Sequence, residues 1–293
     1  MAESAAITRD NLAGDDPGRR DFAFDERDFR RISRLIHERA GIHLSAHKRD
    51  MVYSRLARRV RALGLERFCD YLDALEGDDG PEWEAFTNAL TTNLTSFFRE
   101  AHHFDELVRH LRATPAGPVT LWCAAASTGE EPYSIAIAAC EAYDTPTPPV
   151  RILATDIDTN VVRTAAAGVY PLERIAAVSE QRQRAFFQRG SGPNAGMCRV
   201  KPALRSLVTF RPLNLLDADY RLRGGFQAVF CRNVMIYFDK PTQYAVLARM
   251  APLLAPGGLL FAGHSESFAH AQDIVVPCGR TVYRAAPRSG TRA

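Results

Sequence analysis

A short apolar run leads directly into a loop of small residues at positions 119–132, which read VTLWCAAASTGEEP. The run has the length of a strand, and a helix is expected to begin at the far end of the loop. Similar short runs, separated by helical stretches, follow at 150–155, 207–210, 226–231 and 258–262, with a final strand at 281–285. Such alternation predicts an α/β domain with a doubly wound, mostly parallel sheet. Its ligand should lie at the carboxyl ends of the strands.

A small all-helical domain is expected before the sheet, at residues 21–90. Asp25 and Ser45 are placed to cap two helices, the second with Val52, Leu56, Val60 and Leu63 facing inward, and a third helix follows Pro81. The loop at 189–196 is rich in glycine and suits a hairpin. The expected order is a disordered tail at 1–20, the helical domain at 21–90, a linking helix at 91–111, the α/β domain at 112–286 with an inserted β-subdomain at 172–206, and a tail at 287–293.

Composition and charge exclude several classes of protein. The chain has 293 residues, 46% of them hydrophobic and 24% charged, which is ordinary globular composition. No apolar run is long enough to insert into a membrane, no secretory signal is recognisable, and the six cysteines form no CxxC pair, so we expect a cytoplasmic protein without a metal. The net charge of +3 gives no reason to expect nucleic acid, and nothing demands more than a monomer.

Charge is distributed unevenly along the helical domain. Residues 20–70 hold 13 Lys or Arg against 8 Asp or Glu. Lys48, Arg55 and Arg59 fall at helical spacing beside an apolar face, with Arg58 next to them. The set is either an ordinary solvated face or a surface for an anionic partner.

The loop after the first strand opposes a dinucleotide. It holds one glycine followed by Glu130 and Glu131, where a pyrophosphate would want GxGxxG. Acids at the start of a helix can simply stabilise it, but they would also repel a phosphate and attract a cation. Asp156 ends the second strand, where nucleotide-binding sheets bind ribose hydroxyls, while Asp158 is read as a helix cap. A nucleoside with a cationic amino group and no pyrophosphate fits both loops, and S-adenosylmethionine (SAM) is such a molecule.

Further polar residues are expected at the same edge of the sheet. Arg99 could bind the SAM carboxylate, although a surface arginine is the ordinary alternative. Asn214 follows the third strand, Arg232 and Asn233 end the fourth, and Tyr237 could point into the crevice or into the core. Adjacent histidines at 102 and 103 diverge on a helix, so we do not expect them to share a metal.

An alternative class is a serine hydrolase. Ser127 lies in a sequence that imitates a nucleophile elbow, and Asp156 and His264 follow it in hydrolase order. The acids at the start of the following helix oppose an oxyanion hole there. A fluorophosphonate probe would separate the two classes.

Five motifs, in order, resemble the chemotaxis receptor methyltransferases of the CheR family. They span about residues 22–285 and read TTNLTSFFRE (91–100), ASTGEEPYS (126–134), ATDID (154–158), FCRNVMIYF (230–238) and GHSE (263–266). The resemblance implies a Rossmann-like methyltransferase domain and a SAM-dependent protein-glutamate O-methyltransferase. Such an enzyme forms methyl esters on chemoreceptors and releases S-adenosylhomocysteine during adaptation in bacterial chemotaxis.

The resemblance also implies roles for particular residues. The SAM-binding set would be Asn93, Thr95, Arg99, Glu130, Asp156, Asn214, Leu215, Arg232 and Asn233. Arg99 and Tyr237 would lie near the transferring methyl group. Lys48, Arg55, Arg58 and Arg59 would contact the cytoplasmic helices of the receptor, and the 190–196 loop region would bind a C-terminal tethering peptide. Two rivals remain open: a module that senses SAM without transferring it, and a methyltransferase for small molecules, which would not need the basic helical domain.

Overall fold

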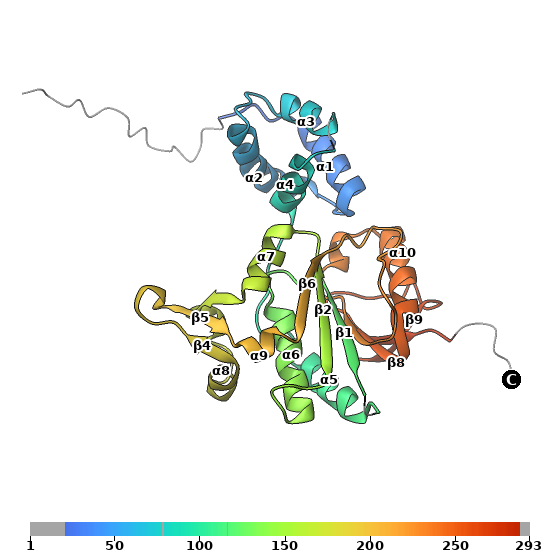
Figure 1. Cartoon of the computed structure of the whole chain (residues 1–293). Coiled ribbons are helices and arrows are strands. Elements are labelled where there is room, and N and C mark those ends of the chain that lie inside the picture. The colour runs from blue at the N-terminus through green and yellow to red at the C-terminus, as the bar shows by residue number, and fades with distance from the viewer. Residues whose placement is uncertain (1–20, 78, 116, 288–293) are drawn as a thin grey trace, which may run out of the picture.

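The computed structural model describes residues 21–77, 79–115 and 117–287. The tail predicted at 1–20, and that predicted at 287–293 except for its first residue, lie outside the described residues. Figure 1 shows a helical domain at one end of an α/β domain, with a small β-subdomain to one side.

The helical domain contains one helix more than the sequence predicted. Its elements are α1 (Glu26–Ala40), the 3-10 turn η1 (Ala46–Lys48), α2 (Arg49–Ala62), α3 (Phe68–Glu76) and α4 (Glu82–Leu90). Asp25 caps α1 as predicted, through hydrogen bonds from the Arg27 and Asp28 amides. The prediction for Ser45 was wrong, because its hydroxyl contacts His47 and the α-helix begins four residues later. Leu63 is exposed rather than inward, since α2 ends before it.

The large sheet confirms the predicted doubly wound fold. Its strand order is β6-β2-β1-β7-β8-β10-β9, parallel through the first five strands and antiparallel at β10 and β9. The strands are β1 (Val119–Ala124), β2 (Val150–Asp156), β6 (Val208–Pro212), β7 (Phe226–Phe230), β8 (Leu254–Phe261), β9 (Val275–Gly279) and β10 (Val282–Ala285). The order reverses between β1 and β7, which is where a crevice opens in such sheets. The edge strand β9 was not predicted from the sequence.

Side chains alternate between two cores on the faces of this sheet. Leu121 and Phe230 pack with α5 (His102–Ala113) and α6 (Glu130–Tyr143), while Trp122 and Val229 pack with α10 (Lys240–Met250) on the other face. Strands that are apolar on both faces are buried on both sides. Within the described residues, no helix is both long and apolar enough to cross a membrane.

The predicted linking helix at 91–111 is only partly helical. Residues 91–101 form an irregular segment, here called the strap, and α5 begins at His102. The left-handed backbone of Phe98 and Glu100 is incompatible with a continuous helix. Asn93, Thr95 and Arg99 therefore lie on the strap and not on a helix.

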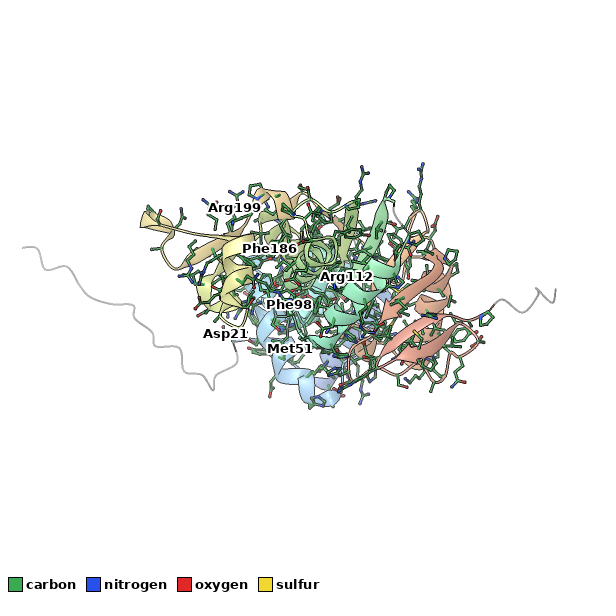
Figure 2. The ribbon with its side chains drawn as sticks, turned by 90° about the horizontal axis from the view of Figure 1, so that it is seen from below. Asp21, Met51, Phe98, Arg112, Phe186 and Arg199 are labelled. Atoms are coloured by element: carbon green, nitrogen blue, oxygen red, sulfur yellow. The ribbon has the colours of Figure 1, made fainter. Side chains whose placement is uncertain are left out.

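The inserted subdomain begins slightly earlier than predicted. Its antiparallel sheet has the order β3-β5-β4, formed by β3 (Val169–Pro171), β4 (Phe187–Arg189) and β5 (Met197–Val200), with α8 (Glu180–Phe186) packed beside β4. The glycine-rich loop joins β4 to β5 as a hairpin, as predicted. Figure 2 shows Phe186 and Arg199 of this subdomain to one side of Arg112 on α5.

Candidate functional site

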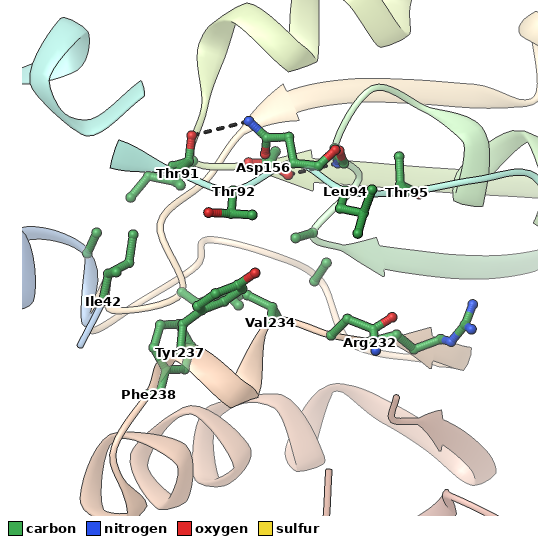
Figure 3. A pocket seen from close by; sticks show the side chains of 18 of the residues that line it. Ile42, Thr91, Thr92, Leu94, Thr95, Asp156, Arg232, Val234, Tyr237 and Phe238 are labelled. Carbon is green, nitrogen blue, oxygen red and sulfur yellow. Dashed lines mark hydrogen bonds between the residues drawn. The ribbon is translucent and has the colours of Figure 1, made fainter. Parts of the chain in front are cut away.

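A pocket lies at the carboxyl ends of β1, β2 and β7, and the helical domain forms one wall of it. Figure 3 shows Tyr237 pointing toward the strap across this pocket, with Ile42 of the helical domain to one side. The polar lining residues are Lys48, Thr91, Thr92, Asn93, Thr95, Arg99, Ser127, Glu131, Thr155, Asp156, Asn214, Arg232, Asn233 and Tyr237. The structure thus brings together every predicted SAM-binding residue except Glu130.

Asp156 occupies the position expected of a ribose ligand. It is the last residue of β2 and is 6% exposed. Its two carboxylate oxygens accept hydrogen bonds from the backbone amides of Ser127 (2.8 Å) and Asp158 (3.0 Å). Burial raises the pKa of Asp156 to about 6, although these hydrogen bonds oppose the shift. A carboxylate held by backbone amides at this edge can accept from two hydroxyls of a nucleoside.

Glu130, predicted to contact SAM, does not line the pocket, whereas its neighbour Glu131 does. Glu130 is fully buried but faces the inserted subdomain, where it pairs with Arg174 and accepts from the Thr128 hydroxyl. Glu131 lines the pocket and pairs with Arg232. Consecutive residues of a helix point about 100° apart, and here the two adjacent acids meet different partners, Arg174 and Arg232.

Arg232 and Glu131 belong to a buried charge network beneath the pocket. The Arg232 side chain is fully buried, pairs with Glu131 and Glu100, and donates to the Arg99 carbonyl at 2.6 Å. Burial raises the pKa of Glu131, with Arg232 opposing the shift. Arg232 is therefore already paired within the protein, and the pair holds the Glu131 carboxylate in place.

The strap is fastened to the α/β domain through Asp158. This carboxylate caps α7 (Thr159–Ala167) as predicted, and it also accepts from the Asn93 side-chain amide at 2.8 Å and the Thr91 hydroxyl at 2.7 Å. Farther along the strap, Arg99 donates to the Leu94 carbonyl at 3.0 Å. Asn93 is therefore a support of the pocket wall as well as a lining residue.

The loop after β7 carries Asn233 and Tyr237. Tyr237 ends the 3-10 turn η4 (Met235–Tyr237), and its carbonyl accepts from the His43 amide of the helical domain at 2.9 Å. Asn233 has a left-handed backbone (φ 58°). Glu266, which the sequence analysis placed in a motif without assigning it a role, accepts from the Asn233 amide at 3.0 Å and from the Ile236 amide at 3.3 Å.

Asn214 and Leu215 lie in the loop after β6, which contacts the helical domain. The Asn214 side-chain amide donates to the Arg39 carbonyl at 2.8 Å, and its oxygen accepts from the Leu216 amide at 3.0 Å. Leu215 is buried and lines the pocket. Leu215 thus offers an apolar surface for a base, while Asn214 also joins the two domains.

The predicted basic stripe is divided by the fold. Arg55 donates to the carbonyls of Ala89 (3.2 Å) and Thr91 (2.5 Å), and Arg59 pairs with Glu82 at 2.5 Å, so both stabilise the domain from within. Arg58 remains exposed, and Lys48 lines the pocket.

The residues of the hydrolase alternative do not form a triad. The Ser127 hydroxyl donates to the Asn93 carbonyl at 3.1 Å, Asp156 contacts backbone amides, and His264 lies beside Glu100. Among the described residues, no three His, Cys, Asp or Glu side chains are grouped so as to hold a metal ion.

The pocket offers the kinds of group that SAM requires, namely a buried carboxylate (Asp156), an apolar surface (Leu215), a second acid (Glu131) and a guanidinium (Arg99). A doubly wound sheet with such a site defines the class of SAM-dependent methyltransferases.

Comparison with known proteins identifies the family within that class. Residues 27–91 match the all-alpha domain of CheR methyltransferases, and residues 93–284 match the SAM-binding domain of CheR methyltransferases. The chain belongs to the CheR methyltransferase family.

Curated relatives align along nearly their whole length. The chemotaxis protein methyltransferase of Klebsiella aerogenes is 55% identical over 256 residues, covering 87% of this chain and 88% of the relative. That of Escherichia coli K12 is 52% identical, covering 89% and 91%. Chemotaxis protein methyltransferase 2 of Pseudomonas aeruginosa is 50% identical, covering 91% and 95%.

Proposed function

We propose that this methyltransferase transfers the methyl group of SAM to glutamate side chains of chemoreceptors, forming glutamyl methyl esters. The relatives' names support a role in chemotaxis. The observation that carries the acceptor class is the helical domain, which forms part of the pocket wall and brings Lys48 into it. A basic group in the pocket favours an anionic acceptor.

The reaction requires little acid–base catalysis from the protein. SAM supplies a methyl group activated by its sulfonium. A glutamate with an unperturbed pKa of about 4.3 is already ionised at neutral pH, so no strong general base is needed. The chain's own residues then have to orient the acceptor and exclude water, effects worth up to about 7–11 kcal/mol in well-oriented intramolecular models. We assign Arg99 and Tyr237 to this positioning.

The part of the receptor that binds this protein would be its cytoplasmic helical region, which Arg58 and Lys48 would contact. A receptor's C-terminal peptide would make a second contact. The inserted sheet supports the latter, because β4 is an edge strand beside the 190–196 loop and edge strands can pair with an added strand. Arg55 and Arg59 would act on this surface only by supporting α2.

The proposal is tested with purified protein, methyl-labelled SAM and receptor-bearing membranes of the same organism. We expect label in a receptor-sized band that mild alkali releases as volatile methanol. Membranes from a strain without receptors are the control. Label that is stable to alkali, or SAM binding measured by calorimetry without any transfer, would contradict the proposal and favour another acceptor or a SAM-sensing module.

A further inference from the structure

Lys48 is the cation that the helical domain contributes to the pocket. It ends η1, is half-buried and lines the pocket beside Tyr237, with its Nζ 5.3 Å from the centre of the Tyr237 ring. We propose that Lys48 binds the carboxylate of the acceptor glutamate directly, and is not merely one charge of a docking surface. This inference rests on the proposed function.

Among the residues that the structure describes, three cations line the pocket, and one of them is already paired within the protein. Arg232 is paired with Glu131 and Glu100. Arg99 and Lys48 line the pocket without an ion pair to any carboxylate that the structure describes. The reaction brings two carboxylates into this cavity, one on SAM and one on the acceptor. Two unpaired cations match two carboxylates, and Arg99 on the strap is assigned to that of SAM.

A backbone hydrogen bond joins the segment before Lys48 to Tyr237. The His43 amide, five residues before Lys48, donates to the Tyr237 carbonyl at 2.9 Å. The ammonium group therefore lies over the same ring whose hydroxyl reaches into the pocket (Figure 3). An acceptor carboxylate between these two groups would have one oxygen held by Lys48, leaving the other free for attack.

The charge change during the reaction gives Lys48 a second consequence. The free carboxylate oxygen forms a bond to the methyl carbon while the bond from that carbon to sulfur breaks, and the electron pair of the broken bond stays on sulfur. The acceptor leaves as a neutral ester. Its attraction to Lys48 is charge-assisted before transfer and weak afterwards, so the same contact that binds the substrate favours release of the product.

The test measures preference for charge at the acceptor and does not depend on turnover. A cytoplasmic receptor fragment is made with either Glu or Gln at a position found to carry the methyl ester, and the Kd of each fragment is measured by calorimetry on protein saturated with S-adenosylhomocysteine. We expect wild-type protein to bind the Glu fragment roughly 10- to 100-fold more tightly, the value of a hydrogen bond to a charged group. Lys48→Met should reduce this ratio to nearly 1, and Lys48→Arg should retain most of it.

Arg58→Met is the matched comparison, because Arg58 is a nearby exposed cation outside the pocket. It should weaken both fragments equally and leave the ratio intact. Calorimetry with SAM and a melting curve verify that Lys48→Met is folded and binds SAM as wild type does. An unchanged ratio in Lys48→Met, or an equal loss in Arg58→Met, would overturn the role of Lys48. Wild-type protein that forms no receptor methyl ester would overturn the proposed function itself.

Discussion

Asp156 and Asp158 stand two residues apart and do different work. Asp158 caps α7 and fastens the strap, whereas Asp156 faces the pocket with a pKa raised to about 6 by burial. An unfolded aspartate titrates near 3.9. Between these two values the folded protein binds more protons than the unfolded chain, so the contribution of Asp156 to stability is present below about pH 4 and is lost as pH rises through about 6.

Replacing Asp156 with Asn should therefore stabilise the protein without ligand while damaging the site. At pH 7.5 we expect the free energy of unfolding to rise by about 1–2 kcal/mol, since removing the buried charge outweighs the loss of one accepted hydrogen bond. The gain should disappear near pH 4. The measurement is denaturant unfolding at the two pH values.

SAM binding should respond in the opposite sense. The affinity of the wild-type protein for SAM should fall as pH drops below about 6, because a protonated Asp156 accepts hydrogen bonds from ribose hydroxyls poorly. Asp156→Asn should bind SAM weakly, with an affinity that does not change with pH in this range. Calorimetric titrations across pH 5–8 measure this. Equal affinity of the two proteins at pH 7.5 would remove Asp156 from the ribose site.

The loop that carries Tyr237 depends on a single buried carboxylate. Glu266 is 6% exposed and accepts hydrogen bonds from the amides of Gly263 (2.5 Å), Asn233 (3.0 Å) and Ile236 (3.3 Å). Burial raises the pKa of Glu266, and the three amides oppose the shift. The carboxylate thus holds the turn between β7 and η4 in place through these amides.

Glu266→Gln should loosen this turn, since a glutamine oxygen replaces only one of the two carboxylate oxygens. We expect kcat to fall more than SAM affinity does, because Tyr237 loses its position. The free energy of unfolding at neutral pH should change little, since removing a buried charge offsets the lost hydrogen bond. Asp219→Asn is a control, as Asp219 accepts one amide hydrogen bond in an exposed loop. Similar effects of both substitutions on kcat would argue against a positioning role.

Elements with strong local signals were predictable from the sequence, and those fixed by distant contacts were not. The capping roles of Asp25 and Asp158 are set within three residues of the cap, so both predictions were correct. The strap looks helical in sequence, but Asp158 and the left-handed backbone of Phe98 hold it open. The choice between Glu130 and its neighbour depends on Arg174 and Arg232, which lie 44 and 101 residues away in the chain.

The two domains form one site because they are joined around the pocket. Besides the bonds from His43 and Asn214, His37 of α1 lies 3.3 Å from Asp239 at the start of α10. Gly41, which ends α1 with φ 69°, packs so closely that a Cβ there would lie 2.9 Å from the Phe238 ring. Phe238 itself lines the pocket. A side chain at position 41 would therefore push the two domains apart and displace Phe238 from the pocket wall.

Substitutions at two glycines distinguish the effect of this domain contact from the effect of backbone strain. Gly64, near the end of α2, has almost the same backbone angle (φ 68°), but a Cβ there would meet nothing within 4 Å. Gly64→Ala should cost only the left-handed conformation, about 1 kcal/mol, and leave SAM binding unchanged. Gly41→Ala adds a contact that Phe238 must yield to, worth about 1–3 kcal/mol more, and should weaken SAM binding roughly tenfold.

Unfolding curves and SAM titrations of both variants measure the difference. Because both variants have the same backbone strain, the additional loss of stability and SAM affinity in Gly41→Ala is due to the contact with Phe238. A variant of Gly41 that binds SAM as tightly as Gly64→Ala does would mean that the pocket keeps its shape when the domains move apart. In that case the helical domain would serve the acceptor only, and the SAM site would belong entirely to the sheet and the strap.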